Sequence, residues 1–327
     1  MTRGKNGAVL VTGGAGYIGA HACKALATAG FLPVTFDNLS RGHRAFVKWG
    51  PLEQGDVRDR KLLDAAFQRW KPKAVMHFAA LASVAESVAH PDLYQDVNVK
   101  GSRNVIDGMV DHGVKCLIFS STASVYGHPE KLPITEETPI APINPYGASK
   151  AAVESEIMER SGALAFAILR YFNAAGADPA AEVGEDHEPE THLIPNAIKA
   201  SLGAARHLDV FGVDYSTPDG TCVRDYVHVS DIADAHVLAL KALLGGDPSF
   251  VCDLGTGSGT SVRDIIKAVA MASGKAVPFK ERPRRLGDPP ALYTSGRGAR
   301  EILQWSPKRS DLKTIIGDAL KWQLRGK

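Results

Sequence analysis

The stretch Val11–Ala20, VTGGAGYIGA, decides the fold because it places three evenly spaced glycines, among four in all, between an apolar run and a helical pattern. Gly13, Gly16 and Gly19 have the spacing GxxGxxG. Glycines at such positions permit a tight turn, the close approach of a pyrophosphate to the backbone, and close helix packing. The following helix directs its unpaired N–H groups and the positive end of its dipole toward the phosphates. Glycines alone would fit an ordinary turn, but the strand and helix around them predict a dinucleotide-binding motif.

Apolar runs alternate with helical patterns along the first half of the chain. Helix-like stretches lie near 17–30, 58–71, 92–112 and 146–161. Buried strands rich in β-branched residues are expected at 8–13, 32–37, 73–80, 114–121 and 164–172. This alternation predicts an α/β protein with a Rossmann-type, doubly wound parallel sheet and right-handed crossovers.

The chain has 327 residues, so two lobes are expected. We expect residues 1–172 to form a Rossmann domain that binds the dinucleotide, and residues 173–327 mainly a smaller, loop-rich α/β domain for substrate. The segment 173–195 is rich in Gly, Pro and acidic residues. Strand and helix patterns resume after it, so segments of about 210–260 are expected to return to the larger domain.

Composition excludes several classes of function. The net charge is +2, and basic and acidic residues are interspersed, which gives no reason to expect nucleic acid or an anionic membrane as partner. The apolar start at 7–20 is too short and too rich in glycine to span a bilayer, and it lacks the layout of a signal peptide. The four cysteines are scattered without a CxxC pair, which argues against a zinc site or a disulfide framework. We therefore expect no metal, incidental buried cysteines and a cytoplasmic location.

Two acidic residues follow the second and third expected strands. Asp37 lies 18 residues after Gly19, where a carboxylate can accept hydrogen bonds from both ribose hydroxyls of an adenosine. It would repel a 2′-phosphate, which favours NAD over NADP, although Arg41 could attract such a phosphate. Asp56 could meet the adenine amino group with Val57 beside the ring; alternatively, Asp56 caps the helix that follows it.

A tyrosine and a lysine form a candidate catalytic pair. Tyr146 and Lys150 lie in NPYGASK (144–150) and share one side of a helix, whose first turn suits Pro145. A free phenol has a pKa of about 10, which a nearby ammonium and a nicotinamide cation would lower. The phenol could then move a carbinol proton while hydride passes to the cofactor. The hydroxyls of SSTASVYG (120–127) could bind the reacting oxygen. YxxxK alone also occurs in ordinary amphipathic helices, but the preceding motifs favour the catalytic interpretation.

Nine motifs together resemble the extended short-chain dehydrogenase/reductase superfamily: VTGGAGYIG, DNLS, GDVRD, HFAA, SSTASVYG, NPYGASK, LRYFNAAGA, DGTCVRDYVHV and LGTG. Their order and wording are similar to those of the UDP-glucose 4-epimerases, and RYFNAAGA and DGTCVRDY narrow the resemblance to that family. It extends from about residue 8 to about residue 305. It implies NAD-dependent inversion at C4 of a UDP-hexose, in galactose metabolism, by a homodimer formed through helices of the larger domain.

The resemblance also implies a mechanism. Tyr146 takes the proton of the sugar 4-hydroxyl while C4 gives hydride to NAD; the 4-keto sugar then turns and receives the hydride on its other face. Thr122 stands where the family usually has a catalytic serine and keeps the hydroxyl. Lys150 holds the nicotinamide ribose and tunes Tyr146. The implied cofactor-binding residues are Gly13, Gly16, Tyr17, Ile18, Gly19, Asp37, Asn38, Asp56, Val57, Phe78, Ala79, Ala80, Asn98, Ser120, Tyr146, Lys150 and Tyr171.

Arg224 and Arg285 match the two arginines by which the family holds the nucleotide diphosphate. Fixed guanidinium groups suit a diphosphate because their hydrogen bonds are charge-assisted and bidentate. Without the motif, either arginine could equally form a surface ion pair. The implied substrate-binding residues are Thr122, Tyr146, Phe172, Asn173, His192, Leu193, Phe211, Arg224, Arg285 and Asp288, the last as a contact of the uridine ribose.

Two departures from the family pattern bear on cofactor and substrate. Ala82 replaces a lysine that some members place near the cofactor phosphate, so NAD is expected to be held less tightly. Leu292 falls where a tyrosine in some members restricts the C2 substituent of the sugar, unless the alignment shifts by one to Tyr293. This leaves 4-epimerisation of UDP-N-acetylglucosamine or UDP-xylose as alternatives.

The residues of the strand end SSTASVYG distinguish this chain from related enzymes with other activities. Nucleotide-sugar 4,6-dehydratases resemble STDEVYG there and use its acids for elimination; Ala123 and Ser124 replace both acids here. UDP-glucuronate decarboxylases carry a glutamate at the position of Ser124. A regulatory protein that only senses nucleotides would be expected to have damaged the Tyr146–Lys150 pair. A net oxidoreductase, or another nucleotide-sugar-modifying member of the superfamily, would be revealed by its products.

Overall fold

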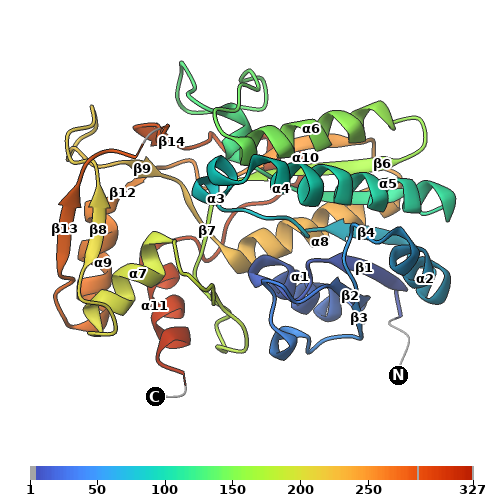
Figure 1. Cartoon of the computed structure of the whole chain (residues 1–327), viewed down its shortest axis with the longest axis horizontal. Helices are drawn as coiled ribbons and strands as arrows, with labels where there is room; N and C mark the ends of the chain where they lie inside the picture. Colours follow the sequence, from blue (N-terminus) through green and yellow to red (C-terminus); the bar gives the residue numbers. More distant parts are fainter. Residues whose placement is uncertain (1–4, 286, 326–327) are drawn as a thin grey trace.

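The computed structural model describes residues 5–285 and 287–325. Figure 1 shows a larger lobe built around a sheet and a smaller lobe beside it. The larger lobe contains a seven-stranded sheet with the order β11-β6-β5-β4-β1-β2-β3, and all its neighbouring strands are parallel. The strands are β1 (Ala8–Thr12), β2 (Leu32–Asp37), β3 (Leu52–Gln54), β4 (Ala74–His77), β5 (Cys116–Thr122), β6 (Ala165–Tyr171) and β11 (Phe250–Leu254). The Rossmann-type α/β fold is confirmed.

Helices cover both faces of this sheet, because successive strand residues point to opposite sides. Val9 and Val11 of β1 face the core beneath α1 (Tyr17–Thr28), α8 (Val229–Gly245) and α10 (Arg297–Leu303). Leu10, between them, faces the core beneath α2 (Arg60–Trp70), α5 (Gly101–Asp111) and α6 (Pro145–Glu159). Because both faces of the sheet are covered, the sequences of its strands are continuous apolar runs and do not alternate between apolar and polar residues.

The segment expected as one helix at 92–112 forms three helical pieces. These are α4 (Pro91–Tyr94), a π-helical turn η2 (Gln95–Lys100) and α5, preceded by the short helix α3 (Val84–Ala89). The side chain of Asp59, not that of Asp56, caps α2 by accepting hydrogen bonds from the backbone N–H groups of Lys61 and Leu62. The capping alternative for Asp56 is therefore wrong.

The smaller lobe has its own apolar core, formed largely by α7 (Leu193–Ser201), α9 (Val262–Ser273) and α11 (Leu312–Gln323). Three small sheets accompany these helices: β7 (Asn173–Ala175) with β10 (Tyr226–His228), β8 (Leu208–Phe211) with β13 (Phe279–Arg282), and β9 (Val223–Arg224) between β12 (Thr260–Ser261) and β14 (Ala291–Leu292). Two 3₁₀ turns, η1 (Arg44–Phe46) and η3 (Ala123–Tyr126), belong to the larger lobe's loops.

The chain passes back to the larger lobe after β10. Helix α8 packs in the core with α1, and β11 pairs with β6 at the edge of the large sheet. By contrast, β8 pairs with β13 in the smaller lobe. Among the described residues, no helix combines the length and apolar character needed to cross a membrane.

Candidate active site

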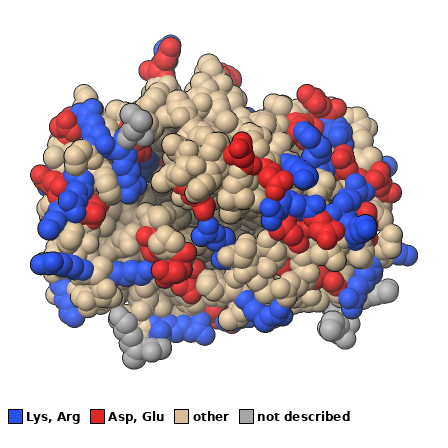
Figure 2. All heavy atoms as spheres, in the orientation of Figure 1, with Lys and Arg blue, Asp and Glu red and all other residues tan. Residues whose placement is uncertain are grey.

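A cavity of about 1260 Å³ opens between the two lobes and is lined by residues of both. The carboxyl ends of β2, β5 and β6 contribute Asp37, Thr122 and Tyr171 to its wall. Figure 2 shows the hollow between the lobes and basic and acidic side chains interspersed around it. Ligands of open α/β sheets bind outside the carboxyl ends of the strands, so this cavity is the candidate active site.

The glycine turn lines one end of the cavity. Gly13 has a φ of 71°, and a Cβ on it would lie 2.6 Å from the backbone nitrogen of Ala79. A Cβ on Gly19 would lie 2.2 Å from the carbonyl oxygen of Gly13. Both positions therefore require glycine, and the N-terminus of α1 begins directly after the turn, at Tyr17. Its first N–H groups have no intrahelical acceptors, which fits the pyrophosphate of a dinucleotide.

Asp37 ends β2 beside this turn. Its two carboxylate oxygens accept hydrogen bonds from Ala15 N at 3.0 Å and Leu39 N at 2.8 Å, which fix the carboxylate's orientation. Burial nevertheless raises the pKa of Asp37 above its usual value. A carboxylate has about four acceptor sites, so it retains capacity for ribose hydroxyls. Asp37, Asn38, Asp56 and Val57 all line the cavity, as an adenosine site requires.

Arg41 and Asp56 have protein partners at this end. Arg58 donates two side-chain hydrogen bonds to Asp56 and lowers the pKa of that carboxyl. Asn38 Nδ2 also donates to Asp56, at 2.8 Å. Arg41, which lines the cavity, pairs with Glu86 of α3, with Nη2 2.6 Å from Oε1. The guanidinium group that could have attracted a 2′-phosphate is thus held by a carboxylate.

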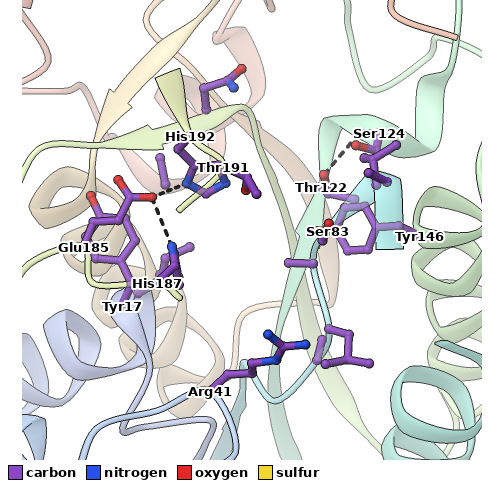
Figure 3. A pocket seen from close by; sticks show the side chains of 18 of the residues that line it. Tyr17, Arg41, Ser83, Thr122, Ser124, Tyr146, Glu185, His187, Thr191 and His192 are labelled. Atoms are coloured by element: carbon purple, nitrogen blue, oxygen red, sulfur yellow. Dashed lines mark hydrogen bonds and ion pairs between the residues drawn. The ribbon is translucent and has the colours of Figure 1, made fainter. Parts of the chain in front are cut away.

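Tyr146 and Lys150 enter the cavity from α6. The Asn144 side chain caps this helix by accepting from Gly147 N at 2.8 Å, and Pro145 occupies its first turn. Lys150 Nζ donates to the carbonyl oxygen of Ser120 at 2.9 Å, which ties the helix to the end of β5. Figure 3 shows Tyr146 beside Thr122 on one wall, with Glu185, His187 and His192 on the opposite wall.

Burial governs the protonation of the catalytic pair. It raises the pKa of Tyr146 above its usual value, and the hydrogen bond with Thr122 only partly opposes this. It lowers the pKa of Lys150 to about 8. From the sequence, the Lys150 ammonium and a nicotinamide cation together are expected to lower the pKa of Tyr146; in the protein alone, burial raises it. The phenol is therefore protonated in the protein alone, and the positive charge of a bound nicotinamide ring would add to that of Lys150 in favouring its ionisation.

The strand end next to Tyr146 carries no acid facing the sugar site. Ala123 and Ser124 line the cavity, and Ser124 N donates to Thr122 Oγ1 at 3.1 Å. Behind them, Glu154 of α6 accepts from Ser121 Oγ and from Arg170, whose Nη2 lies 2.6 Å away. The buried acid of this region is thus neutralised by Arg170 and turned away from the reaction.

The far wall holds the expected diphosphate-binding residues. Arg224 Nη2 lies 2.7 Å from Asp288 Oδ1, and its side chain is 12% exposed. The Arg285 guanidinium lies 3.9 Å from the centre of the Phe211 ring. These contacts hold two cationic groups at the substrate end of the cavity, opposite the glycine turn.

The cavity brings together all the expected site residues except Asn98. Asn98 is buried; its Oδ1 accepts from Leu81 N at 2.8 Å, and its Nδ2 donates to Leu81 O and to Ser149 Oγ, each at 3.0 Å. Both of its polar atoms are therefore used to shape the loop after β4, and Asn98 positions the cavity wall instead of lining it. Of the two residues at the position where some members carry a tyrosine, Leu292 lines the cavity and Tyr293 does not.

Sequence reasoning missed three further groups in the wall: Glu185, His187 and Glu190. Glu185 Oε1 contacts His192 Nδ1 and lies 3.4 Å from His187 Nδ1. Glu185 and Glu190 raise the pKa of His187 to about 10. The segment EDHEPETH (185–192) does bring acids and histidines together in the sequence. Its Gly-, Pro- and acid-rich composition, however, indicated only a polar loop.

Comparison with known proteins agrees with this geometry. The model of the "NAD dependent epimerase/dehydratase family" matches residues 9–253. A UDP-glucose 4-epimerase of Rhizobium leguminosarum bv. trifolii is 47% identical over 319 residues, which are 97% of this chain and 97% of that protein. The crystal structure of UDP-glucose 4-epimerase from Brucella ovis in complex with NAD superposes with a TM-score of 0.94 at 46% identity, covering 96% of this chain and 98% of that one.

A third relative was solved with a nucleotide sugar. The UDP-glucose 4-epimerase of Stenotrophomonas maltophila, with bound NAD and formylated UDP-arabinopyranose, has a TM-score of 0.94 at 40% identity, covering 97% of this chain and 98% of that one. Identity at this level over nearly the whole length of both chains shows common descent as well as a common fold. The chain therefore belongs to the NAD-dependent epimerase/dehydratase family and, within it, to the UDP-glucose 4-epimerases.

Proposed function

We propose that this chain is an isomerase that interconverts UDP-glucose and UDP-galactose by NAD-dependent inversion at C4. The observation that carries the proposal is the single cavity that joins the glycine turn, the Tyr146–Lys150 pair and the Arg224–Arg285 end. A dinucleotide and a nucleotide sugar are each long and anionic, and the cavity offers phosphate-binding groups at both ends with a proton-transfer group between them. The relatives crystallised with NAD and with a UDP-sugar support the same assignment.

The protein's own residues move one proton and hold the sugar. NAD supplies the chemistry of hydride acceptance and return when it is bound in the glycine-turn half of the cavity. Tyr146 takes the proton of the 4-hydroxyl and later gives it back. Thr122, which lies beside Tyr146 (Figure 3), orients the same sugar oxygen. Lys150, held by Ser120 O, adds positive charge that favours the phenolate.

Inversion requires the 4-keto sugar to turn while its nucleotide stays bound. Arg224 and Arg285 lie at the other end of the cavity from the glycine turn, and their guanidinium groups can hold the diphosphate by charge-assisted hydrogen bonds. Ala123 and Ser124 leave no acid to start elimination or decarboxylation of the intermediate. A fixed diphosphate with a free hexose ring favours return of hydride to the opposite face.

The wall at Leu292 favours a second, related activity. Leu292 lines the cavity and is smaller than the tyrosine of some family members, so it leaves room for a substituent at C2 of the sugar. The alternative is therefore 4-epimerisation of UDP-N-acetylglucosamine or, at the other extreme of size, of UDP-xylose. Both use the same Tyr146 chemistry.

Oligomeric state and location are part of the same proposal. We expect a homodimer formed by the helices of the larger lobe, where Val110 of α5 and Met158 of α6 are each 41% exposed. Four free, buried cysteines suit a reducing compartment, and we assign the chain to the cytoplasm and to galactose metabolism. Sedimentation of the purified chain tests the dimer directly.

The decisive experiment incubates the purified chain with UDP-galactose, UDP-N-acetylgalactosamine and UDP-xylose and scores each C4 epimer by NMR. We expect UDP-glucose from UDP-galactose without net change in NADH absorbance. Formation of stoichiometric NADH, or the absence of every C4 epimer, contradicts the proposal.

A further inference from the structure

Four side chains on the cavity wall opposite Tyr146 converge without a place in the proton transfer. Glu185, His187, Glu190 and His192, called here the Glu–His cluster, each offer one potential ligand atom, and these atoms all lie within 4.8 Å of one another. Figure 3 shows Glu185 between the two imidazoles. Only His192 of the four is among the expected substrate contacts.

The separations in the cluster approach those of a metal coordination shell. His187 Nδ1 lies 3.4 Å from Glu185 Oε1 and 3.8 Å from Glu190 Oε1. Four ligands at about 2.0–2.1 Å from Zn²⁺ in a tetrahedron stand about 3.3 Å apart. Glu185 and His192 are in closer contact than this, so loading requires that contact to open by rotation of exposed side-chain bonds.

The two carboxylates of the cluster are balanced by imidazoles, whose protons a metal ion can replace. The Glu185 and Glu190 side chains are only 6% and 3% exposed. Over residues 5–285 and 287–325, the ion-pair partners of these two carboxylates are the imidazoles of His187 and His192, and no lysine or arginine joins them. Buried carboxylates are stable only when paired or bound to metal. A divalent ion would displace the imidazole protons to solvent and neutralise both carboxylates in their place.

The backbone around the cluster holds the carboxylates in place. Thr191 N and His192 N donate to Glu190 Oε1 at 2.8 and 2.9 Å. Trp322 Nε1 of α11 donates to the carbonyl oxygen of Glu185 at 2.9 Å. Outer hydrogen bonds of this kind orient metal ligands. The His187 and His192 side chains are 35% and 53% exposed to the cavity side, which provides a route for an ion.

We propose that the Glu–His cluster is a binding site for one divalent transition-metal ion, with Zn²⁺ as the reference ion. Two imidazoles and two carboxylates complete a tetrahedral shell, which is the form of a structural site and leaves no position for substrate. The ion would link Glu190 and His192, which directly precede α7, to Glu185. The carbonyl oxygen of Glu185 is in turn bound by Trp322 of α11. The absence of a CxxC pair excludes only a cysteine zinc site, and the Glu–His cluster contains no cysteine.

The test measures metal binding and not turnover. The full-length chain without an affinity tag is stripped with a chelator and dialysed against Zn²⁺, and bound zinc is counted by elemental analysis. Competition with a chromophoric chelator gives the affinity, and the absorption of the Co²⁺-loaded chain reports a four-coordinate site. We expect one ion per chain and the intense visible bands of tetrahedral Co²⁺.

Two variants and one matched control complete the test. His187→Ala and Glu190→Gln should each weaken Zn²⁺ binding by more than the roughly 10- to 100-fold that loss of an outer-shell partner costs. Glu190→Gln keeps the acceptor for Thr191 N, so its fold is preserved. His112→Ala removes an imidazole paired with one carboxylate, Asp64 at 3.0 Å, and should leave binding unchanged.

Two results would overturn the proposal. One is that the chain, after stripping and dialysis against Zn²⁺, holds no zinc above background. The other is equal retention by wild type, His187→Ala and Glu190→Gln. Either result identifies the cluster as ion pairs held by protons alone. Because neither measurement uses a nucleotide sugar, the outcome is independent of the proposed epimerase activity.

Discussion

Arg224 Nη2 donates a hydrogen bond of 2.7 Å to Asp288 Oδ1, although 64 positions separate the two residues in the chain. The carboxylate holds the guanidinium group at the substrate end of the cavity before any ligand arrives. Arg224 Nη1 also donates to the carbonyl oxygen of Val223 at 2.9 Å. A guanidinium group fixed in this way loses little side-chain entropy when it binds a diphosphate.

Arg224→Ala should therefore act mainly on substrate binding. Loss of a charged hydrogen-bonding group costs about 1.5–3 kcal/mol, so we expect KM for UDP-galactose to rise roughly 10- to 100-fold with kcat changed only a few-fold. The control is Arg263→Ala, which breaks the exposed pair with Glu281 at 3.1 Å and should leave KM unchanged. An Arg224→Ala enzyme with wild-type KM would show that the diphosphate is held elsewhere.

Tyr146→Phe removes the phenolic hydroxyl that lies beside Thr122 in the cavity wall (Figure 3). Turnover should fall by about 10²- to 10⁴-fold, because general acid–base catalysis is lost while the ring remains. NAD released on denaturation should stay at the wild-type amount per chain. Full turnover by this variant would reject the assigned role of Tyr146.

Thr122→Ser and Thr122→Val separate the hydroxyl of Thr122 from its bulk. Serine keeps the hydroxyl that lies beside Tyr146 (Figure 3) and that accepts from Ser124 N at 3.1 Å, so we expect near wild-type kcat. Valine keeps the shape and loses the hydroxyl, so kcat should fall at least about tenfold. Equal rates for the two variants would contradict a role for this hydroxyl.

Local patterns predicted the part of the site that depends on neighbours in sequence. The spacing of Tyr146 and Lys150 fixes their relative placement on any helix, and the glycine turn follows from steric limits on the backbone. Non-local pairing could not be predicted in the same way. The partner of Arg224 is Asp288, and the buried position of Asn98 depends on how the loop at Leu81 folds over it.

Local sequence patterns also failed to predict the Glu–His cluster and the division of the segment 92–112 into separate helical pieces. Glu185 is buried because Trp322 of the distant α11 packs over its backbone, and no local pattern states this. The π-helical turn at Gln95–Lys100 has no local breaker such as proline inside it, so the pattern of 92–112 indicated one helix. The pKa of Tyr146 likewise depends on burial, which is a property of the assembled fold.

Arg41→Ala tests how the enzyme retains its cofactor without a lysine at position 82. Arg41 lines the cavity beside Asn38 and Asp56, and its Nη2 lies 2.6 Å from Glu86 Oε1 in a partly exposed ion pair. Exposed ion pairs contribute about 0.2–1 kcal/mol, so the dissociation rate of NAD should rise by roughly 1.5- to 5-fold. Stopped-flow displacement measures this rate. Arg69→Ala, which breaks an exposed pair with Glu53 remote from the cavity, is the control, and identical rates would exclude a role for the Arg41–Glu86 pair.

Leu292→Tyr should change which sugar fits. A tyrosine at this cavity wall occupies the space available to an N-acetyl group at C2, so kcat/KM for UDP-N-acetylgalactosamine should fall relative to that for UDP-galactose. A pocket clash of this kind changes discrimination by about 1–3 kcal/mol, or roughly 10- to 150-fold. Tyr293→Leu, next to it and outside the cavity lining, should leave the ratio unchanged. An unaltered ratio in Leu292→Tyr would place the C2 substituent elsewhere.

Asp253 makes the stability of the larger lobe depend on pH. It is fully buried at the edge of the large sheet, and burial raises its pKa to about 7 even though it accepts a hydrogen bond from Tyr126 Oη at 2.7 Å. Between about pH 4 and pH 7 the folded chain therefore binds more protons at this site than the unfolded chain. Its contribution to stability is present at low pH and is lost as the pH rises to 7, by up to about 1.4 kcal/mol per pH unit.

Asp253→Asn removes this dependence and keeps an acceptor for Tyr126. Urea unfolding at pH 5 and pH 8 should show a smaller loss of unfolding free energy in the variant than in wild type. The exposed Asp247→Asn controls for the change in net charge and should follow the wild-type curve. If wild type and Asp253→Asn lose stability equally over this range, the carboxylate is already ionised at pH 5, and Arg170, rather than a proton, compensates its charge.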